Sequence, residues 1–297
     1  MTPTATRRSQ RGQQRTQAAA SPPASEWDTD RLDVAAYLGR IGYEGRLEPS
    51  SAVLTALHRA HATTIPFENL DIILGHGISL DIEDIQDKLL RGGRGGYCFE
   101  HNLLFSALLE RAGFSARRLV ARVEPDKPGP RTHMVLNVTA DGREWLADVG
   151  FGAALLEPVP LVDGVTVRQG DWAHGVTREP DGSWRLRTLG AEGWSDLYAF
   201  SSDPQRPNDY VVYNHYTSTY PGSPFVNQVV AMRVTPTERF TLRNHDLSTA
   251  FPDGSTHRRE LTDGGVLQAL HEPFGITLDS ADETTLVSFL QRKEPRP

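Results

Sequence analysis

The sequence predicts an α+β protein in which helices come first, strands follow, and the last part mixes both. Apolar residues recur at helical spacing between residues 29 and 112. From Ser115 to Phe200 the pattern changes to short alternating runs that are separated by three Asp-Gly turns, which is typical of a meander or a small barrel. The final part combines a strand-like run at residues 226–234 with a predicted helix near residues 283–290.

The first 25 residues differ in composition from everything that follows. They carry four arginines and no acidic residue, among Thr, Ser, Gln, Ala and Pro. Such a segment has too little apolar surface to bury, so we expect a disordered tail over residues 1–25. A transit peptide or a start codon placed too far upstream are the alternatives.

Three helices are expected before the first glycine-rich segment, because each stretch carries its apolar residues on one face. The positions are Leu32, Ala35, Leu38 and Ile41 in the first helix, Val53, Leu54, Leu57 and Ala60 in the second, and Ile82, Ile85, Leu89 and Leu90 in the third.

Cys98, the one cysteine of the chain, follows a glycine-rich turn at residues 91–97. An amphipathic helix is predicted from this point, with apolar residues at helical spacing and Gly113 as its stop, so Cys98 lies at or near the first helical turn. Free N–H groups and the positive end of the helix dipole favour the thiolate there, and a thiolate attacks carbonyl carbon. The alternative is a small buried core residue.

A hairpin brings a histidine and a carboxylate together. Residues 132–139 and 143–149 both alternate, and the Asp-Gly pair at 141–142 between them indicates a two-residue turn. Counting outward from this turn places Asp148 as a same-face diagonal neighbour of His133, about 7–8 Å away between backbone positions. A carboxylate that orients an imidazole, which in turn takes a proton from Cys98, is therefore possible. Each residue alone is also consistent with a purely structural role.

Other polar residues have open roles. His58 and His61 are three residues apart, as a metal pair could be, but no third ligand accompanies them, so a surface or interdomain role is favoured. His101 lies near Cys98 on the predicted helix and is a rival base. Glu68 and Glu100 could be buried partners that hold a domain junction together.

Taken together, the motifs resemble a known family. Segments 94–102, 132–134 and 148–152 look like the three signature segments of the arylamine N-acetyltransferases. Segments 37–43 and 65–71 are similar to the amino-terminal region of that family, and the resemblance extends over roughly residues 27 to 290. From the residues alone, the interpretation stops at a cysteine acyl-transfer enzyme or hydrolase.

The resemblance implies an arrangement of domains. It implies a helical bundle with the catalytic cysteine at residues 26–113, a β-barrel with the histidine and the aspartate at 114–205, and an α/β lid at 206–297. The catalytic core implied is of the cysteine-protease or transglutaminase type, with Cys98, His133 and Asp148 as its triad.

The resemblance also implies a reaction and its ligands. Acetyl-CoA is the expected donor, arylamines or arylhydrazines are the expected acceptors, and no metal is required. Phe151 is expected to line the arylamine pocket, Phe225 to lie near the acceptor and the pantetheine, and Gly129 to lie in a loop that meets the coenzyme. Phe151 and Phe225 could equally be core aromatics, and Gly129 part of a simple Pro-Gly turn.

Three other functions stay open. An amide synthase of the same fold forms macrolactams from a carrier-bound acyl donor. A transglutaminase-like cysteine hydrolase shares the order of cysteine, histidine and aspartate. An inactive binding module would keep the fold, although a complete triad argues against it.

Composition indicates which partners and which cellular compartment to expect. The net charge of −7 gives no electrostatic reason to expect nucleic-acid binding. A single cysteine excludes an internal disulfide and favours a reducing compartment, so a cytoplasmic protein is expected. No apolar run approaches the roughly 18 residues of a membrane span. The sequence does not indicate an oligomeric state.

Overall fold

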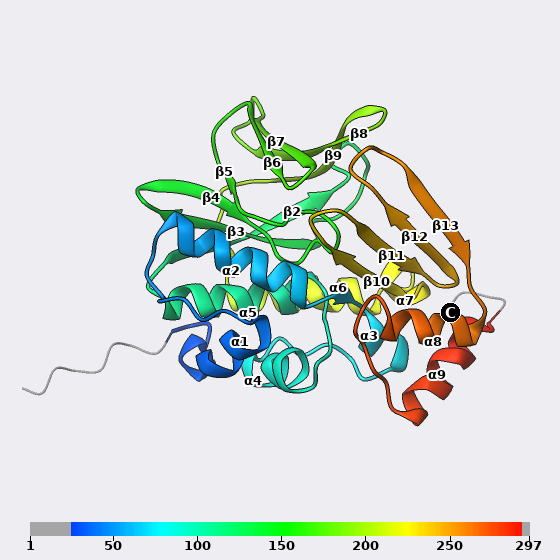
Figure 1. The fold of residues 1–297 in the computed structure, drawn as a ribbon. Helices are drawn as coiled ribbons and strands as arrows, with labels where there is room; N and C mark the ends of the chain where they lie inside the picture. Colours follow the sequence, from blue (N-terminus) through cyan, green and yellow to red (C-terminus); the bar gives the residue numbers. More distant parts are fainter. Residues whose placement is uncertain (1–24, 293–297) are drawn as a thin grey trace, which may run out of the picture.

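The computed structural model describes residues 25–292, so nearly all of the predicted tail, residues 1–24, lies outside the described residues. The first part of the described chain is helical, as predicted (Figure 1). It contains η1 (Thr29–Arg31), α1 (Val34–Ile41), α2 (Ser51–Thr64), the short strand β1 (Phe67–Glu68), α3 (Leu70–Leu74), α4 (Ile82–Gln86), the π-helical turn η2 (Asp87–Arg91) and α5 (Cys98–Arg111).

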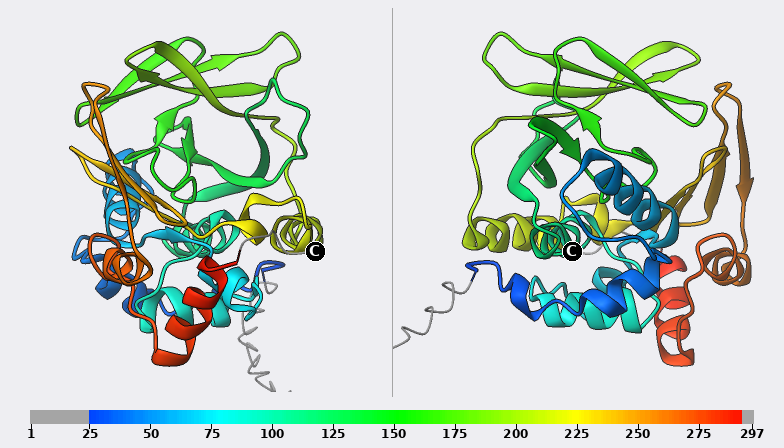
Figure 2. Two further views of the ribbon diagram at one scale, coloured as in Figure 1. Left: turned by 90° about the vertical axis from the view of Figure 1, so that its right-hand side faces the viewer. Right: turned by 60° about the vertical axis from the view of Figure 1, so that its left-hand side comes forward.

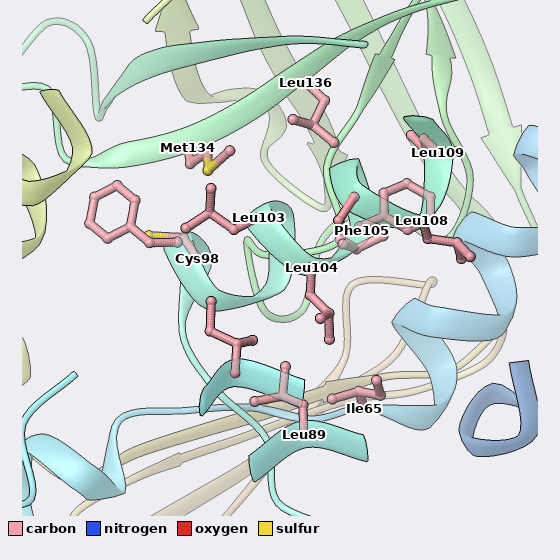
Figure 3. Close-up of a cluster of buried hydrophobic side chains, with 14 of the residues drawn as sticks. Ile65, Leu89, Cys98, Leu103, Leu104, Phe105, Leu108, Leu109, Met134 and Leu136 are labelled. Carbon is pink, nitrogen blue, oxygen red and sulfur yellow. The ribbon is translucent and has the colours of Figure 1, made fainter. Parts of the chain in front are cut away.

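Helix α5 lies at the centre of this part and is buried on all sides along residues 98–109. Figure 1 shows it between strands β2 to β4 and helices α1 and α4. In Figure 3, Leu103 lies towards Met134 on β3, and Leu104 points the other way, towards Ile65 and Leu89. The expected amphipathic pattern is therefore wrong for α5, because a helix that is covered on both sides needs no polar face.

The second part is an eight-stranded antiparallel sheet in the order β5-β4-β3-β2-β9-β8-β7-β6. Its edge strands β5 and β6 are joined by only four residues, 161–164, which span at most about 18 Å. The sheet must therefore curl until its edges approach each other, as a small barrel does (Figure 2). The strands are β2 (Ser115–Val123), β3 (His133–Ala140), β4 (Arg143–Ala147), β5 (Val159–Pro160), β6 (Val165–Gln169), β7 (Trp172–Arg178), β8 (Trp184–Gly190) and β9 (Gly193–Phe200).

The β3–β4 hairpin has the predicted register. Ala140 pairs with Arg143, and the ladder continues to the pair of Leu136 and Ala147. Asp141 and Gly142 have φ values of 49° and 71°, the two positive values that a type I′ turn requires. Asp148 follows directly after the last paired residue of β4.

The third part is a five-stranded antiparallel sheet with helices around it, in the order β1-β10-β11-β12-β13. Phe67 of β1 pairs with Met232 of β10, which joins this sheet to the helical part of the chain. Its elements are α6 (Pro207–Thr219), α7 (Pro224–Asn227), β10 (Val230–Val234), β11 (Arg239–Arg243), β12 (Asp246–Ala250), β13 (Thr256–Glu260), α8 (Asp263–His271) and α9 (Ser280–Leu290).

The predicted boundaries after residues 113 and 205 fall between elements of the structure. Helix α9 confirms the helix expected near residues 283–290. The strand-like run at residues 226–234 is correct only from Val230, because Ser223 caps the short helix α7 and Pro224 begins it. None of the described helices is both long and apolar enough to cross a bilayer.

Candidate active site

Cys98 is the first residue of α5, as the sequence predicts. The Glu100 carboxylate accepts a hydrogen bond of 3.0 Å from the Tyr97 N–H, which closes the first turn of the helix. The thiol is 3% exposed and lies 3.6 Å from the Thr132 carbonyl oxygen, to which it can donate. The sulfur therefore lies at the N-terminus of a helix and next to the strand that carries His133.

His133 and Asp148 form a direct, buried pair. The Nε2 of His133 donates to the Asp148 carboxylate at 2.7 Å, so the second ring nitrogen is left for another partner. The same carboxylate accepts bonds from the Tyr198 hydroxyl at 2.8 Å, the Asn102 amide at 2.9 Å and the Gly150 N–H at 3.0 Å. Four donors hold the carboxylate ionised and fixed in one orientation.

This arrangement keeps the imidazole charged. Burial by itself lowers the pKa of His133, but the charge and the hydrogen bond of Asp148, with a smaller contribution from Cys98, raise it to about 10. Burial likewise raises the pKa of Asp148, and the charge of His133 with the bonds from His133, Asn102 and Tyr198 lowers it below its ordinary value. The site therefore holds an imidazolium beside the Cys98 sulfur at neutral pH.

Asn102 and His58 also hold the backbone around Asp148 in place. The Asn102 amide donates to the Met134 carbonyl at 2.7 Å and accepts from the Val149 N–H at 3.2 Å, so it ties α5 to β3 and to the segment that follows β4. The Nε2 of His58 accepts from the Asp148 N–H at 3.1 Å, while its Nδ1 donates to a carbonyl. Burial lowers the pKa of His58 to about 4, so this ring stays neutral.

Close approach to Cys98 comes from Gly150. A Cβ at Gly150 would lie 2.9 Å from the Cys98 Cα and 2.7 Å from the Asn102 amide nitrogen, so only glycine fits there. In the 91–97 turn, a Cβ at Gly95 would meet the Pro66 carbonyl oxygen at 2.0 Å, so that glycine lets the turn pack against another chain segment.

A buried network of charges anchors this turn. Arg94 bonds Glu68 at 2.8 Å and Asp71 at 3.0 Å, while Lys88 bonds Asp71 at 2.7 Å and Glu100 at 2.9 Å. The network ties the start of α5 to α3 and η2. Glu68 and Glu100 are therefore buried structural partners, as the sequence suggested.

Two further buried histidines, His61 and His101, do not line the cavity that holds Cys98. His61 is fully buried, where it accepts from the Tyr37 hydroxyl and donates to His101 at 2.7 Å. His101 donates in turn to the Pro66 carbonyl at 3.1 Å, so it is not free to act as a base on Cys98. Of the two positions expected for His58 and His61, the surface one is wrong, because both side chains are buried. His58 bonds the backbone of Asp148 and Leu156 from α2, as the alternative of a role between parts of the chain predicts. Within residues 25–292, no three His, Cys, Asp or Glu side chains are grouped to hold a metal.

A cavity of about 680 Å³ opens onto Cys98 and His133. Phe151 lines it and packs edge-on against the His133 ring, with 4.9 Å between centroids. Phe225 also lines it and contacts Phe67 and Tyr97. Gly129 is not among the lining residues, although Glu124 and Thr132 from the same loop are. The full lining consists of Phe67, Cys98, Val123, Glu124, Thr132, His133, Gly150, Phe151, Ala153, Ala154, Leu197, Pro224, Phe225, Val230, Met232, Arg239, Thr241 and Arg243.

Comparison with known proteins finds relatives over most of the chain. Residues 51–283 match the model of an N-acetyltransferase family. The arylamine N-acetyltransferase of Mycolicibacterium smegmatis is 38% identical over 257 residues, which are 83% of this chain and 93% of the relative. The chain belongs to the arylamine N-acetyltransferase family.

Solved structures of the family have the same fold. The Nocardia farcinica arylamine N-acetyltransferase superposes with a TM-score of 0.86 at 39% identity, covering 91% of this chain and 99% of the other. The Mycobacterium marinum enzyme, solved in complex with CoA, superposes with a TM-score of 0.81 at 33% identity, covering 87% and 98%.

Several residues of the site were not predicted from the sequence. Asn102 lies within segment 94–102, and its position four residues after Cys98, on the same face of the helix, could have identified it. Tyr198, His58 and the lining residues of β10 and β11 gave no local signal, because they reach the site from distant parts of the chain.

Proposed function

We propose that the chain transfers an acetyl group from acetyl-CoA, through an acetyl-Cys98 intermediate, to the nitrogen of arylamines or arylhydrazines. Cys98, His133 and Asp148 are its catalytic triad. One observation carries the proposal: the Cys98 thiol and the His133 imidazolium line the same cavity, and Asp148 fixes the imidazole from outside it.

The first half-reaction acetylates the cysteine. The Cys98 thiolate attacks the thioester carbonyl carbon, the bond from that carbon to the coenzyme sulfur breaks, and the His133 imidazolium gives its proton to the departing thiolate. One thioester replaces another, so the step costs little free energy. As the first residue of α5, Cys98 has a backbone N–H with no intrahelical acceptor, which makes it a candidate donor to the oxyanion.

The second half-reaction releases the product. The amine nitrogen attacks the acetyl-Cys98 carbonyl, the carbon–sulfur bond breaks, and neutral His133 takes the amine proton. This restores the thiolate and the imidazolium. The order is ping-pong, because coenzyme A leaves before the amine attacks.

Two observations support the assignment of the ligands. The Mycobacterium marinum relative was solved with CoA, which favours acetyl-CoA as the donor here. Phe151 and Phe225 line the cavity, which supports their roles beside the acceptor and the pantetheine. Gly129 stays a prediction for the coenzyme loop.

We further propose the division into a helical bundle, a β-barrel and an α/β lid around a protease-like catalytic core. The reaction needs a reduced thiol at Cys98, which suits a reducing compartment such as the cytoplasm.

Steady-state kinetics test this function. Release of coenzyme A from acetyl-CoA should depend on an added arylamine or arylhydrazine, and double-reciprocal plots at several amine concentrations should be parallel. Cys98→Ser should abolish release. Intersecting lines would contradict the covalent order, and coenzyme A release that is independent of any amine would favour a hydrolase.

A further inference from the structure

One face of the five-stranded sheet forms a wall of the active-site cavity. Side chains alternate between the two faces of a strand, and the cavity-lining residues of β10 and β11 follow this alternation. Leu242, between two of them, lies in the hydrophobic core on the other face. The lining residues on these strands are Val230, Met232, Arg239, Thr241 and Arg243.

Arg239 on this wall is largely buried, and no carboxylate among the described residues pairs with it. One of its amino groups, Nη2, donates to the Ala154 carbonyl at 3.1 Å and to His174 Nε2 at 3.1 Å. Its guanidinium stacks on Trp172, with 3.7 Å from Cζ to the ring centroid. The buried Nε has no partner in the described part of the chain, and no acceptor is found there for Nη1.

Two other arginines with unpartnered buried nitrogens, Arg118 and Arg233, differ from Arg239 in their partner or in their position. Arg118 pairs with the carboxylate of Glu110. Arg233, on the neighbouring strand β10 and on the opposite face of the sheet, donates to the Pro273 carbonyl at 2.7 Å. It has no carboxylate partner among the described residues either, but it does not line the cavity. Arg239 thus combines an unpaired charge with a position on the wall of the cavity that holds Cys98.

The charge of Arg239 persists at neutral pH. Burial lowers the pKa of Arg239 to about 10, well above neutrality. Glu124, the one acidic residue among the described cavity lining, is exposed and pairs with Lys127 at 2.6 Å. A buried cation without a counter-ion is costly, and an anion in the cavity would offset that cost.

We propose that Arg239 is an anion-recognition residue of the cavity, which binds a carboxylate on the amine acceptor or a phosphate of the coenzyme. The guanidinium fork suits either group, since both present paired oxygens. The kinetic test of this proposal rests on the proposed function. The proposal adds the class of ligand group, an anion, that the same cavity binds.

The acceptor test compares 4-aminobenzoate with its neutral isostere 4-aminobenzamide, and the donor test compares acetyl-CoA with S-acetylpantetheine, which lacks the phosphates. Each is measured with the wild type, Arg239→Met, Arg239→Lys and the control Arg233→Met. Loss of a charge-assisted hydrogen bond should lower kcat/KM of Arg239→Met for the anionic partner about 10- to 100-fold. The neutral partner should change less than threefold, and Arg239→Lys should fall between.

A second measurement does not depend on turnover. Benzoate should protect Cys98 from iodoacetamide in the wild type and in Arg233→Met, but not in Arg239→Met, and benzamide should protect all three equally if at all. Inorganic phosphate is tested in the same way for the coenzyme group. If the wild type transfers nothing to any amine, the proposed function fails while this protection still tests the anion site.

Selective loss with 4-aminobenzoate assigns the anion to the acceptor, and selective loss with acetyl-CoA assigns it to the coenzyme. Equal losses for anionic and neutral partners, with benzoate and phosphate protecting Arg239→Met as well as they protect the wild type, would overturn the proposal. Arg239 would then only join β11 to the barrel.

Discussion

Replacing Asp148 with asparagine tests its effect on His133 most informatively, because the substitution keeps the shape of the side chain and removes its charge. The asparagine oxygen can still accept from Asn102 and Gly150 in the place of the carboxylate oxygen that does so now. The amide nitrogen then faces His133 and donates to its Nε2. The imidazole must move its proton to Nδ1, where it can no longer accept one from Cys98.

The structure gives a magnitude for this effect. His58 and His101 are as buried as His133 but have no carboxylate partner, and the pKa of each is about 4. If the pKa of His133 falls from about 10 to this level, roughly one molecule in 10³ carries the imidazolium at pH 7. We therefore expect Asp148→Asn to lower kcat about 10³-fold, compared with the roughly 10⁴-fold loss for the equivalent change in a serine triad.

The assay is rapid-mixing release of coenzyme A in the first turnover, with thermal unfolding to confirm that the variant is folded. Tyr198→Phe is the matched control, because it removes one of the four bonds to the carboxylate and leaves its charge. The control should lose about 10- to 100-fold, since a hydrogen bond to a charged group is worth roughly 1.5–3 kcal/mol, and so less than Asp148→Asn. A folded Asp148→Asn protein with turnover near that of the wild type would refute this account of Asp148.

The remaining predictions concern the support of the site. Gly150→Ala should cost about 1–3 kcal/mol of stability and lower kcat at least about tenfold, because the new Cβ displaces Cys98; unchanged kinetics would show that Cys98 tolerates the shift. Lys88→Met leaves Glu100 buried without its cation and should lower the free energy of unfolding by about 3 kcal/mol, whereas an unchanged melting temperature would mean that the network adds nothing. The raised pKa of His133 stabilises the fold fully below the unfolded value of 6.5, and this contribution is lost as pH rises through about 10. Denaturant unfolding at pH 6 and pH 9.5 should therefore show the advantage of the wild type over His133→Gln shrinking at the higher pH, and a constant difference would contradict the shift.

The local part of this site could be predicted from the sequence. The Asp-Gly turn fixes the hairpin register, and the register brings Asp148 to His133. The glycine-rich turn and the apolar spacing after it correctly predict that a helix begins at Cys98. Turn chemistry and side-chain periodicity act over a few residues, so one sequence is enough to read them.

The rest depends on contacts between distant segments. His58 bonds the backbone of a residue 90 positions away, and Arg239 reaches the cavity only because β10 and β11 pack against it. Burial of α5 on every side also comes from its neighbours, and its own pattern predicts a polar face. No local rule gives these positions, because tertiary packing alone determines them.

Mass spectrometry of the enzyme after brief exposure to acetyl-CoA without an amine tests the central claim most directly. One acetyl group should be found on the peptide that contains Cys98, and it should disappear when an arylamine is added. Prior alkylation of the thiol should prevent the labelling. An acetyl group found elsewhere while Cys98 remains free, with transfer still proceeding, would contradict the covalent mechanism.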